Sequence, residues 1–314
     1  MSGMKNPFRF LKVLLLLSLA VSLSAKEKET VKIAYLPITH AYPLFVEQEL
    51  YGKNLENTKI ELVRFGSWLE LVEALNAGKV DGASILFPLA VKARENGIAL
   101  KAVALGHRDG NVFVTDKEIN NIHELKGKTV AIPSRLSAHY ILLHQALKSA
   151  GMTVNDIKIT ELPPPEMPAA LAEKRISGYI VAEPFGAKAV ALGKGKVLQK
   201  SEDIWKDSMC CALVLRSEFI TNKPLQAKEL TTGYLHAARS LEKKEHCAVE
   251  AGKKYLKVPD KVLEISLNWI SYADLGIKKA EYDQLIAYMK ELDLIKKTPA
   301  YEDFVDNNLI SNIK

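Results

Sequence analysis

The 314-residue sequence has few cysteines, few aromatic residues and only one long hydrophobic run. Its three cysteines, Cys210, Cys211 and Cys247, are too few for a disulfide scaffold. Aromatic residues make up 7%, and no basic stripe is interleaved with them, which excludes the usual kind of nucleic-acid surface. With 48% hydrophobic and 25% charged residues, the composition also excludes disorder, collagen and coiled coil as the main state. The length allows about two domains.

The single hydrophobic run lies in the first 25 residues, which contain no acid. This segment contains Lys5, Arg9 and Lys12, which account for three of the six net positive charges of the chain. The net charge of the rest is therefore small and does not point to a particular class of binding partner. The three basic residues precede a leucine-rich run over residues 13–21 and a cleavage region rich in small residues over residues 22–25. This layout predicts a cleaved export signal in residues 1–25, the alternative being an uncleaved N-terminal anchor. A lipid anchor would need a cysteine at the cleavage site, and no cysteine lies near it. We therefore expect a periplasmic protein without a lipid anchor.

After residue 25, short hydrophobic segments alternate with stretches that carry apolar residues at helical spacing. The expected strands cover residues 31–36, 59–65, 82–87, 129–132, 157–161, 178–181 and 210–216, and the first helices residues 42–50, 68–77, 138–150 and 167–174. Strand–helix alternation predicts an α/β fold with parallel-rich sheets covered by helices. The remainder is predicted to be helical, over residues 224–244, 259–269, 280–292 and 300–313.

A pattern in the first half of the chain recurs 96 residues later. Residues 74–93 match residues 170–189, with Gly82 aligned on Gly178. The repeat predicts two similar α/β lobes. Beyond the signal at 1–25, we expect a first part of lobe I over residues 31–112, lobe II over 113–210, and a return to lobe I with C-terminal helices over 211–314.

Ligands of open parallel sheets bind beyond the carboxyl ends of the strands, where helix N-termini favour anions. The residues expected at those ends are Thr39, His40, Ser67, Trp68, Phe87, Pro88, Arg135, Ser137, His139 and Glu183. Asn111 is also expected to bind the ligand. Each also has an ordinary structural interpretation. Ser67 and Ser137 are good N-caps, Trp68 suits a core, and Glu183 suits a helix cap.

Sequence motifs of the common enzyme classes are missing: no G-x-S-x-G, Walker loop, H-E-x-x-H or C-x-x-C is present. Cys210-Cys211 suggests a soft metal. Adjacent residues of a strand point to opposite faces, however, so we expect one of the pair to face the core. The sequence therefore predicts no enzyme, no metal and no cofactor.

Six segments, in order, resemble the substrate-binding proteins of nitrate/sulfonate/taurine ABC importers. They are residues 36–44, 67–68 with 73–88, 137–140 with 150–151, 163–167, 183–185 and 203–207. The resemblance implies the type II periplasmic-binding-protein fold, with two lobes, two crossover strands and a ligand in the cleft between lobes. It also implies that Trp68 and His139 contact the ligand.

One residue departs from the family pattern. Where nitrate binders have a lysine that pairs with the anion, this chain has Cys211, and a buried anion without a cation is costly. The departure argues against nitrate as the ligand. Cys211 is added to the expected ligand-binding residues, and Arg135 is the residue that could supply the missing positive charge.

The resulting hypothesis is a monomeric solute-binding receptor that delivers a small molecule to a permease and ATPase in the inner membrane. The solute is a nitrate-, sulfonate- or bicarbonate-like anion or a related small organic molecule. Two alternatives remain: an enzyme on the same scaffold, related to thiamine-pyrimidine synthesis, and a ligand-sensing module for a receptor.

Overall fold

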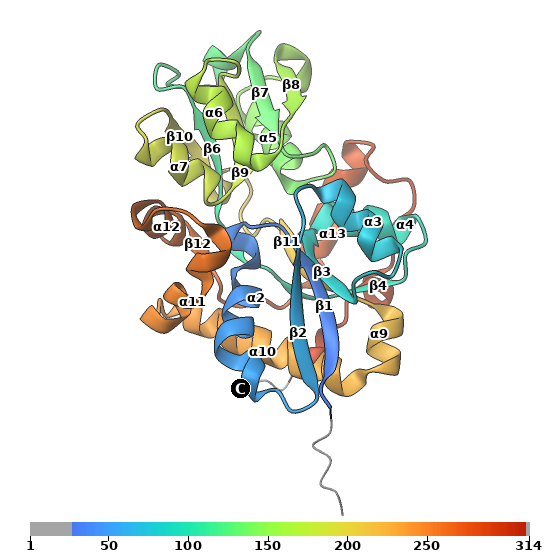
Figure 1. Ribbon diagram of the computed structural model, residues 1–314. Coiled ribbons are helices and arrows are strands. Elements are labelled where there is room, and N and C mark those ends of the chain that lie inside the picture. Colours follow the sequence, from blue (N-terminus) through green and yellow to red (C-terminus); the bar gives the residue numbers. More distant parts are fainter. Residues whose placement is uncertain (1–26, 312–314) are drawn as a thin grey trace, which may run out of the picture.

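The computed structural model describes residues 27–311 and contains two five-stranded sheets, each covered by helices, in two lobes joined by two connections (Figure 1). The predicted export signal lies outside the described residues. No described helix combines the length and apolar character needed to cross a bilayer.

The sheet of lobe I has the strand order β2-β1-β3-β11-β4. Strands β2, β1 and β3 are parallel, and β11 runs antiparallel to both β3 and β4. The bounds are β1 Glu29–Tyr35, β2 Thr58–Arg64, β3 Gly82–Leu86, β4 Leu100–Leu105 and β11 Cys211–Arg216.

The sheet of lobe II repeats this arrangement in the order β8-β7-β9-β6-β10. Strands β8, β7 and β9 are parallel, and β6 runs antiparallel to β9 and β10. The bounds are β6 Asn111–Thr115, β7 Thr129–Ile132, β8 Lys158–Glu161, β9 Gly178–Ala182 and β10 Lys196–Lys200. The predicted α/β fold class is confirmed.

The 96-residue repeat falls on equivalent strands of the two sheets. Gly82 begins β3 and Gly178 begins β9, each beside the antiparallel strand of its sheet. A Cβ on Gly82 would lie 2.6 Å from the Val214 carbonyl oxygen, and one on Gly178 would lie 3.0 Å from that of Val114. A glycine stands at both positions because the neighbouring strand passes so close.

The chain crosses between the lobes twice. It leaves lobe I after β4, passes through the short β5 (Arg108–Asp109) and enters lobe II at β6. It returns after β10 and α8 (Ser201–Ile204), and joins the first sheet as β11. Both connections run through the junction of the lobes.

Helices begin directly after the parallel strands. In lobe I, α2 (Tyr42–Val46), α3 (Trp68–Asn76) and α4 (Phe87–Glu95) follow β1, β2 and β3; in lobe II, α5 (Ala138–Ser149), α6 (Met167–Ala172) and α7 (Phe185–Ala191) follow β7, β8 and β9. Ser67 caps α3 by accepting from the Glu70 amide, and Ser137 caps α5 by accepting from the Tyr140 amide. The predicted segments agree with these elements to within a few residues, except that α2 ends in a short π-helical turn.

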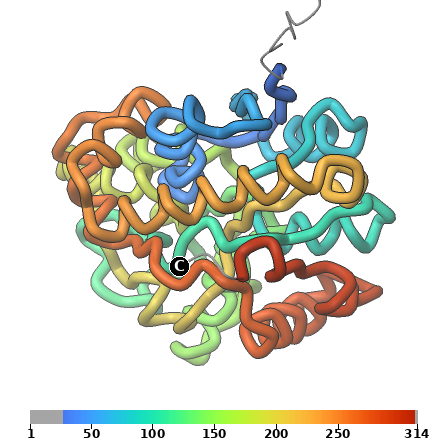
Figure 2. The backbone as a smooth tube through the Cα atoms, turned by 90° about the horizontal axis from the view of Figure 1, so that it is seen from below, coloured from blue at the N-terminus to red at the C-terminus, as the bar shows by residue number. Residues whose placement is uncertain are grey.

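The C-terminal third packs mainly on lobe I. Figure 2 shows α10 crossing its underside, with the later helices to either side. The helices are α9 Ser217–Asn222, α10 Pro224–Glu242, α11 His246–Leu256, α12 Asp260–Leu267, α13 Lys279–Glu291 and α14 Tyr301–Phe304. Helix α11 was not predicted, and the helix predicted over residues 300–313 is wrong from residue 305 to residue 311; its last two residues lie outside the described part of the chain. Val305 instead bridges Ala102 of β4, the Asp306 amide donates to the Ala102 carbonyl, and only a 3₁₀ turn over Asn307–Leu309 follows.

Candidate functional site

Four metal-ligating side chains meet at the junction of the lobes: His40, His107, Cys210 and Cys211. All four are buried, and one nitrogen or sulfur atom from each lies within 4.8 Å of the others. His40 belongs to a 3₁₀ turn after β1, and His107 lies on the first crossing. The two cysteines stand where the second crossing enters β11. We call these residues the His/Cys cluster.

The two cysteine side chains lie together, and the prediction that one of them faces away is wrong. Their Sγ atoms are 3.8 Å apart, and His40 Nδ1 lies 3.3 Å from Cys211 Sγ and 3.6 Å from Cys210 Sγ. The expectation fails because β11 begins only at Cys211. Cys210 precedes the strand, so the strict alternation of side chains does not apply to it.

Each cluster histidine bonds a backbone carbonyl through one ring nitrogen. His40 Nε2 lies 3.1 Å from the Gly110 oxygen, and His107 Nδ1 lies 2.7 Å from the Asp109 oxygen. A carbonyl only accepts, so these nitrogens carry the protons, and neutral rings then have lone pairs on His40 Nδ1 and His107 Nε2. His107 Nε2 is buried without a hydrogen-bond partner.

Lobe II adds two polar side chains beside the cluster. His139, in the first turn of α5, places Nε2 4.0 Å from Cys210 Sγ, and Asn111, at the start of β6, places Oδ1 3.5 Å from the same sulfur. His139 Nδ1 and Asn111 Nδ2 are buried without partners. Both residues were predicted from the sequence, and the structure brings them together with His40 and Cys211.

The cluster changes the acidity of its own groups. Burial, and then the charge of His107, lower the pKa of His40 to about 4. Burial raises the pKa of the Cys210 thiol, but its hydrogen bond with Cys211 and the charges of His139 and His40 outweigh burial and hold that pKa well below its usual value. Burial and the bond with Cys210 raise the pKa of Cys211. The site therefore favours a neutral His40 ring and a thiolate on Cys210.

Thr39 and Glu183 join the two lobes next to the cluster. The Thr39 amide and hydroxyl both donate to the Glu183 carbonyl, at 2.9 and 3.0 Å. The Glu183 carboxylate accepts from the Ser266 hydroxyl at 2.7 Å and from the Ala187 amide. The carboxylate therefore has a structural role, in agreement with the cap interpretation. Burial raises its pKa from 4.5 to about 7 against these hydrogen bonds.

Replacing Glu183 with glutamine should remove a pH-dependent loss of stability. Between pH 4.5 and 7 the folded protein keeps a proton on Glu183 that the unfolded chain releases, so wild-type stability falls as pH rises through this window. The full shift is equivalent to about 3 kcal/mol. In urea unfolding at pH 5 and pH 8, the free energy of unfolding of Glu183→Gln relative to that of wild type should be higher at pH 8 than at pH 5. If the free energy of unfolding changes by the same amount between the two pH values in both proteins, the prediction is wrong.

Two further predicted residues line a cleft between the lobes. Ser67 and Trp68 of lobe I face Pro133, Ser134 and residues 161–164 of lobe II across a space of about 240 Å³. Trp68 is buried, and its indole nitrogen has no partner. In this cleft Trp68 could make the contact with a ligand that the family resemblance implies.

The remaining predicted residues contribute less to the junction. Phe87 packs in the lobe I core with its ring against Tyr282 and Phe304, and Pro88 starts α4 beside it. Arg135 is half-exposed and ion-paired with Glu161 at 3.7 Å, so it brings no charge to the cluster. Ser137 is the buried N-cap of α5.

Sequence analysis missed His107 and left Cys210 out of the expected site. A signal was present: His107 lies on the first crossing, directly before Arg-Asp-Gly-Asn, and Cys210 is the last residue of the second crossing. Since both crossings pass through the junction, polar residues at their ends meet there.

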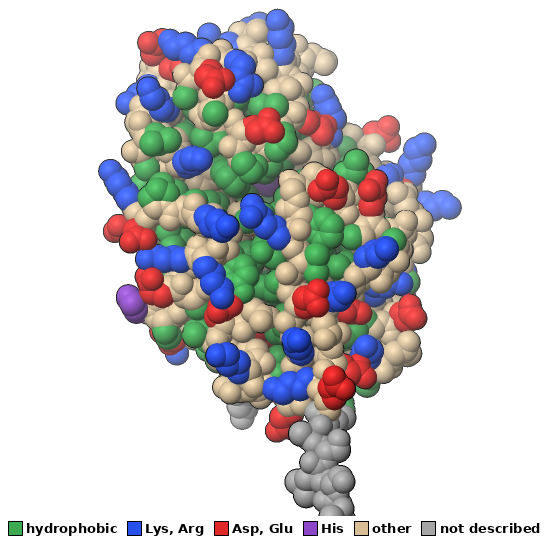
Figure 3. Space-filling view, in the orientation of Figure 1, with side chains coloured by type: hydrophobic (Ala, Val, Ile, Leu, Met, Phe, Trp, Pro, Cys, Tyr) green, Lys and Arg blue, Asp and Glu red, His purple; other side chains and the backbone are tan. Residues whose placement is uncertain are grey.

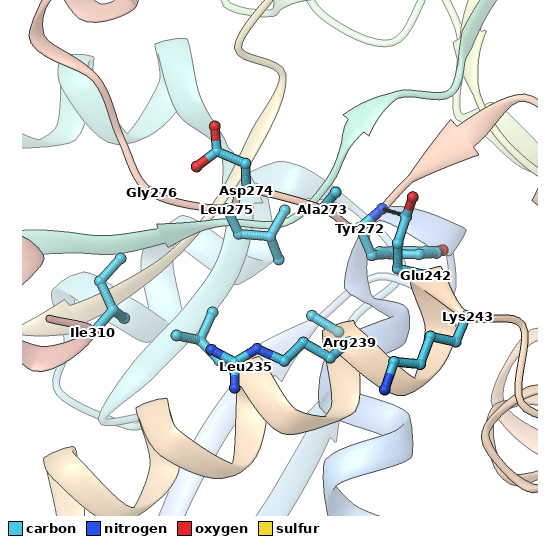
Figure 4. Close-up of a pocket in the computed structure, with 11 residues that line it drawn as sticks. Leu235, Arg239, Glu242, Lys243, Tyr272, Ala273, Asp274, Leu275, Gly276 and Ile310 are labelled. Atoms are coloured by element: carbon cyan, nitrogen blue, oxygen red, sulfur yellow. Dashed lines mark hydrogen bonds between the residues drawn. The ribbon is translucent and has the colours of Figure 1, made fainter. Parts of the chain in front are cut away.

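A cavity of about 440 Å³ lies in lobe I apart from the cluster (Figure 4). One wall is formed by residues 235–242 of α10 and by Lys243 after it, and the other by residues 272–276. Glu242 accepts a hydrogen bond from the Tyr272 amide. No member of the His/Cys cluster lines this cavity.

Comparison with known proteins identifies the family. The model described as the NMT1-like family matches residues 24–252. The chain belongs to the NMT1-like family. The taurine-binding periplasmic protein of Escherichia coli is 30% identical over 276 residues, which is 85% of this chain and 80% of that protein. The nitrate/nitrite binding protein NrtA of Nostoc is 24% identical over 278 residues, covering 79% of this chain.

The chain spans 41% to 63% of the length of the first three curated relatives that it matches. Among solved structures, a ligand-binding component of an ABC-type import system from Staphylococcus aureus, described with zinc bound, is 38% identical with a TM-score of 0.86. The match covers 91% of this chain and 99% of that one. The nitrate-binding protein NrtA of Synechocystis shares the fold, with a TM-score of 0.81 at 17% identity over 92% of this chain and 89% of that one.

These findings confirm the predicted resemblance to nitrate, sulfonate and taurine binding proteins. The relatives of this kind are binding proteins rather than enzymes, which confirms the prediction that the chain is not an enzyme.

Proposed function

We propose that this protein is the solute-binding receptor of an ABC importer, capturing a small solute between its lobes and delivering it to a permease and its ATPase. The observation that carries the proposal is the convergence of both lobes and both crossings on one buried point. His40 comes from lobe I, His139 and Asn111 from lobe II, and His107 and Cys210 from the two crossings.

Such a point couples binding to closure. A solute held by groups of both lobes binds the closed form more tightly than the open form, and this difference in affinity drives closure. The proposed moving bodies are lobe I, with residues 31–112 and 211–314, and lobe II, with residues 113–210. The named relatives include periplasmic proteins, which supports export to the periplasm. We propose that the chain acts there as a monomer.

The charge of the site narrows the choice of solute. Relatives are named for nitrate, bicarbonate, sulfonates and taurine, and one solved relative contains zinc. Within residues 27–311, no lysine or arginine is hydrogen-bonded or ion-paired to the His/Cys cluster. Arg135 is committed to Glu161. A nitrate- or sulfonate-like anion would therefore have to rely on neutral donors, which favours a solute that needs no buried positive charge.

Photo-crosslinking in the native host tests delivery to a permease. The permease must face the opening between the lobes, and Leu69, which is 68% exposed, stands at the lobe I side of the interlobe cleft. A photoreactive residue in place of Leu69 should crosslink to an integral membrane protein.

Leu225 is the matched control, because it is similarly exposed but begins α10 on the underside of lobe I (Figure 1). Crosslinking from position 225 should give no membrane partner. The receptor proposal fails if neither position yields one, or if only position 225 does.

A further inference from the structure

We propose that His40, His107, Cys210 and Cys211 bind a thiophilic divalent metal ion, Zn²⁺ by charge and geometry. Two imidazoles and two thiolates are a common ligand set for Zn²⁺, which takes four ligands in a tetrahedron. Sequence analysis set a metal aside because one cysteine was expected to point away, and the structure removes that reason.

The distances within the cluster fit a tetrahedral site before any ion is placed. With Zn–S bonds of about 2.3 Å and Zn–N bonds of about 2.0 Å, tetrahedral geometry puts two sulfurs about 3.8 Å apart and a sulfur and a nitrogen about 3.5 Å apart. The observed separations are 3.8 Å between the sulfurs, and 3.3 and 3.6 Å from His40 Nδ1 to them. Little movement is needed to seat the ion.

The second ring nitrogens have the partners that metal-binding histidines have. A ligating histidine donates its other N–H to a carbonyl or carboxylate, which fixes the tautomer and the ring orientation. Gly110 and Asp109 supply those carbonyls, to His40 Nε2 and His107 Nδ1. His107 is 1% exposed, and its Nε2 has no partner, so an ion would satisfy a buried atom that is otherwise unpaired.

Charge balance favours a divalent ion. The charges of two thiolates and one Zn²⁺ sum to zero, so the site needs no cationic side chain. The described residues supply none, because Arg135 is paired with Glu161 and Cys211 stands in place of the lysine of the nitrate-binder pattern. A buried charge must be paired, and the metal supplies the pairing. Reversing the Asn111 amide would also direct its unpartnered Nδ2 at Cys210 Sγ, as a donor to the thiolate.

The placement of the ligands suggests cargo rather than a fixed structural ion. The four ligands come from lobe I and the crossings, while lobe II contributes only the nearby His139 and Asn111. Opening the lobes would uncover the ion, and closing them would cover it. That the ion is the transported solute rests on the proposed function; the binding site itself does not.

The test titrates the reduced, metal-free protein with Zn²⁺ in competition with a chromophoric chelator. Wild type should bind one ion per chain, and Co²⁺ in the same site should give thiolate-to-cobalt charge-transfer absorption. The double variant Cys210→Ser, Cys211→Ser should bind Zn²⁺ more than about 100-fold more weakly, since loss of even an outer partner costs about 10- to 100-fold. Cys247→Ser, at the exposed cysteine, should bind as wild type does.

His107→Gln and His123→Gln form a second matched pair, because His123 is exposed. Only the first should weaken binding. The Co²⁺ spectrum of wild type decides the question even if a cysteine variant does not fold: absence of thiolate absorption overturns the proposal, as does equal Zn²⁺ affinity in the double serine variant.

Parallel titrations with nitrate and taurine separate the two proposals. If an anion binds and Zn²⁺ does not, the metal site is wrong and the receptor function stands. If Zn²⁺ binds through the cysteines, but deleting the gene leaves cellular uptake of radioactive zinc unchanged, the site stands and zinc as cargo is overturned.

Discussion

Replacing Gly252 with alanine is expected to lower the free energy of unfolding by about 3 kcal/mol or more, at the upper end of what overpacking costs. A Cβ at this position of α11 would lie 1.7 Å from Cε2 of Tyr42. The Tyr42 ring is fully buried, and its hydroxyl donates to the Val249 carbonyl at 2.6 Å. At 1.7 Å the two carbon atoms cannot both keep their positions, so either the helix or the ring must move.

Urea unfolding measures this loss directly. Gly276→Ala is the control, because a Cβ there would meet nothing closer than 3.9 Å, and its stability should stay close to that of wild type. If Gly252→Ala unfolds at the wild-type midpoint, the packing of α11 on α2 is not as the structure shows.

The same contact shows what the C-terminal helices do for the site. Tyr42 follows the turn that holds His40, and the Tyr272 hydroxyl donates to the Thr39 carbonyl at 2.9 Å in that turn. Contacts from the C-terminal third thus hold in place the turn that carries His40 of the His/Cys cluster. The sequence predicted helices in this region that pack on lobe I, and that prediction did not include their support of His40.

The fold was predictable because its signals are local. Buried parallel strands read as short apolar runs, and the serine before α3 and the serine before α5 mark helix starts. The repeat added the second lobe, since Gly82 and Gly178 meet the same constraint in both sheets. The error at residues 300–313 has the opposite cause: a single bridge from Val305 to β4, a tertiary contact, overrides a helical pattern.

The site was only partly predictable because its ligands come from segments without periodicity. His40 and His139 follow parallel strands, where the rule for open sheets finds them. His107 and Cys210 lie on the crossings, and no local pattern brings two crossings to one point. The alternation rule also misled at Cys210, because the rule holds only inside a strand and β11 starts one residue later.

A second large effect is expected at Trp205, which holds the lobes together from the side of lobe II. It follows α8, is 4% exposed, and packs edge-on against Tyr288 of α13 with ring centroids 5.0 Å apart. Its indole nitrogen donates to Gln284 Oε1 at 3.3 Å. Since α13 belongs to the C-terminal region, this contact spans the junction.

Trp205→Ala should cost about 3–5 kcal/mol, the range for deleting a buried large aromatic. Because the lost contact joins the lobes, we also expect the closed form to open more often. Cys210 and Cys211 are buried at the junction, whereas Cys247 is exposed, so the chain carries its own reference thiol. In native buffer without metal, a thiol reagent should modify Cys247 at the same rate in wild type and variant, and the cluster cysteines faster in the variant.

Global unfolding would also expose these thiols, and Gly252→Ala separates the two causes. Its clash lies within lobe I, so it should lose a similar amount of stability without loss of the interlobe contact. Faster labelling of the cluster cysteines in Trp205→Ala than in Gly252→Ala would show opening at the junction. Equal rates in two variants of equal stability would mean that Trp205 stabilises the fold but does not control access to the cluster. Trp205→Phe, which keeps a ring against Tyr288 and loses only the bond to Gln284, should label close to the wild-type rate.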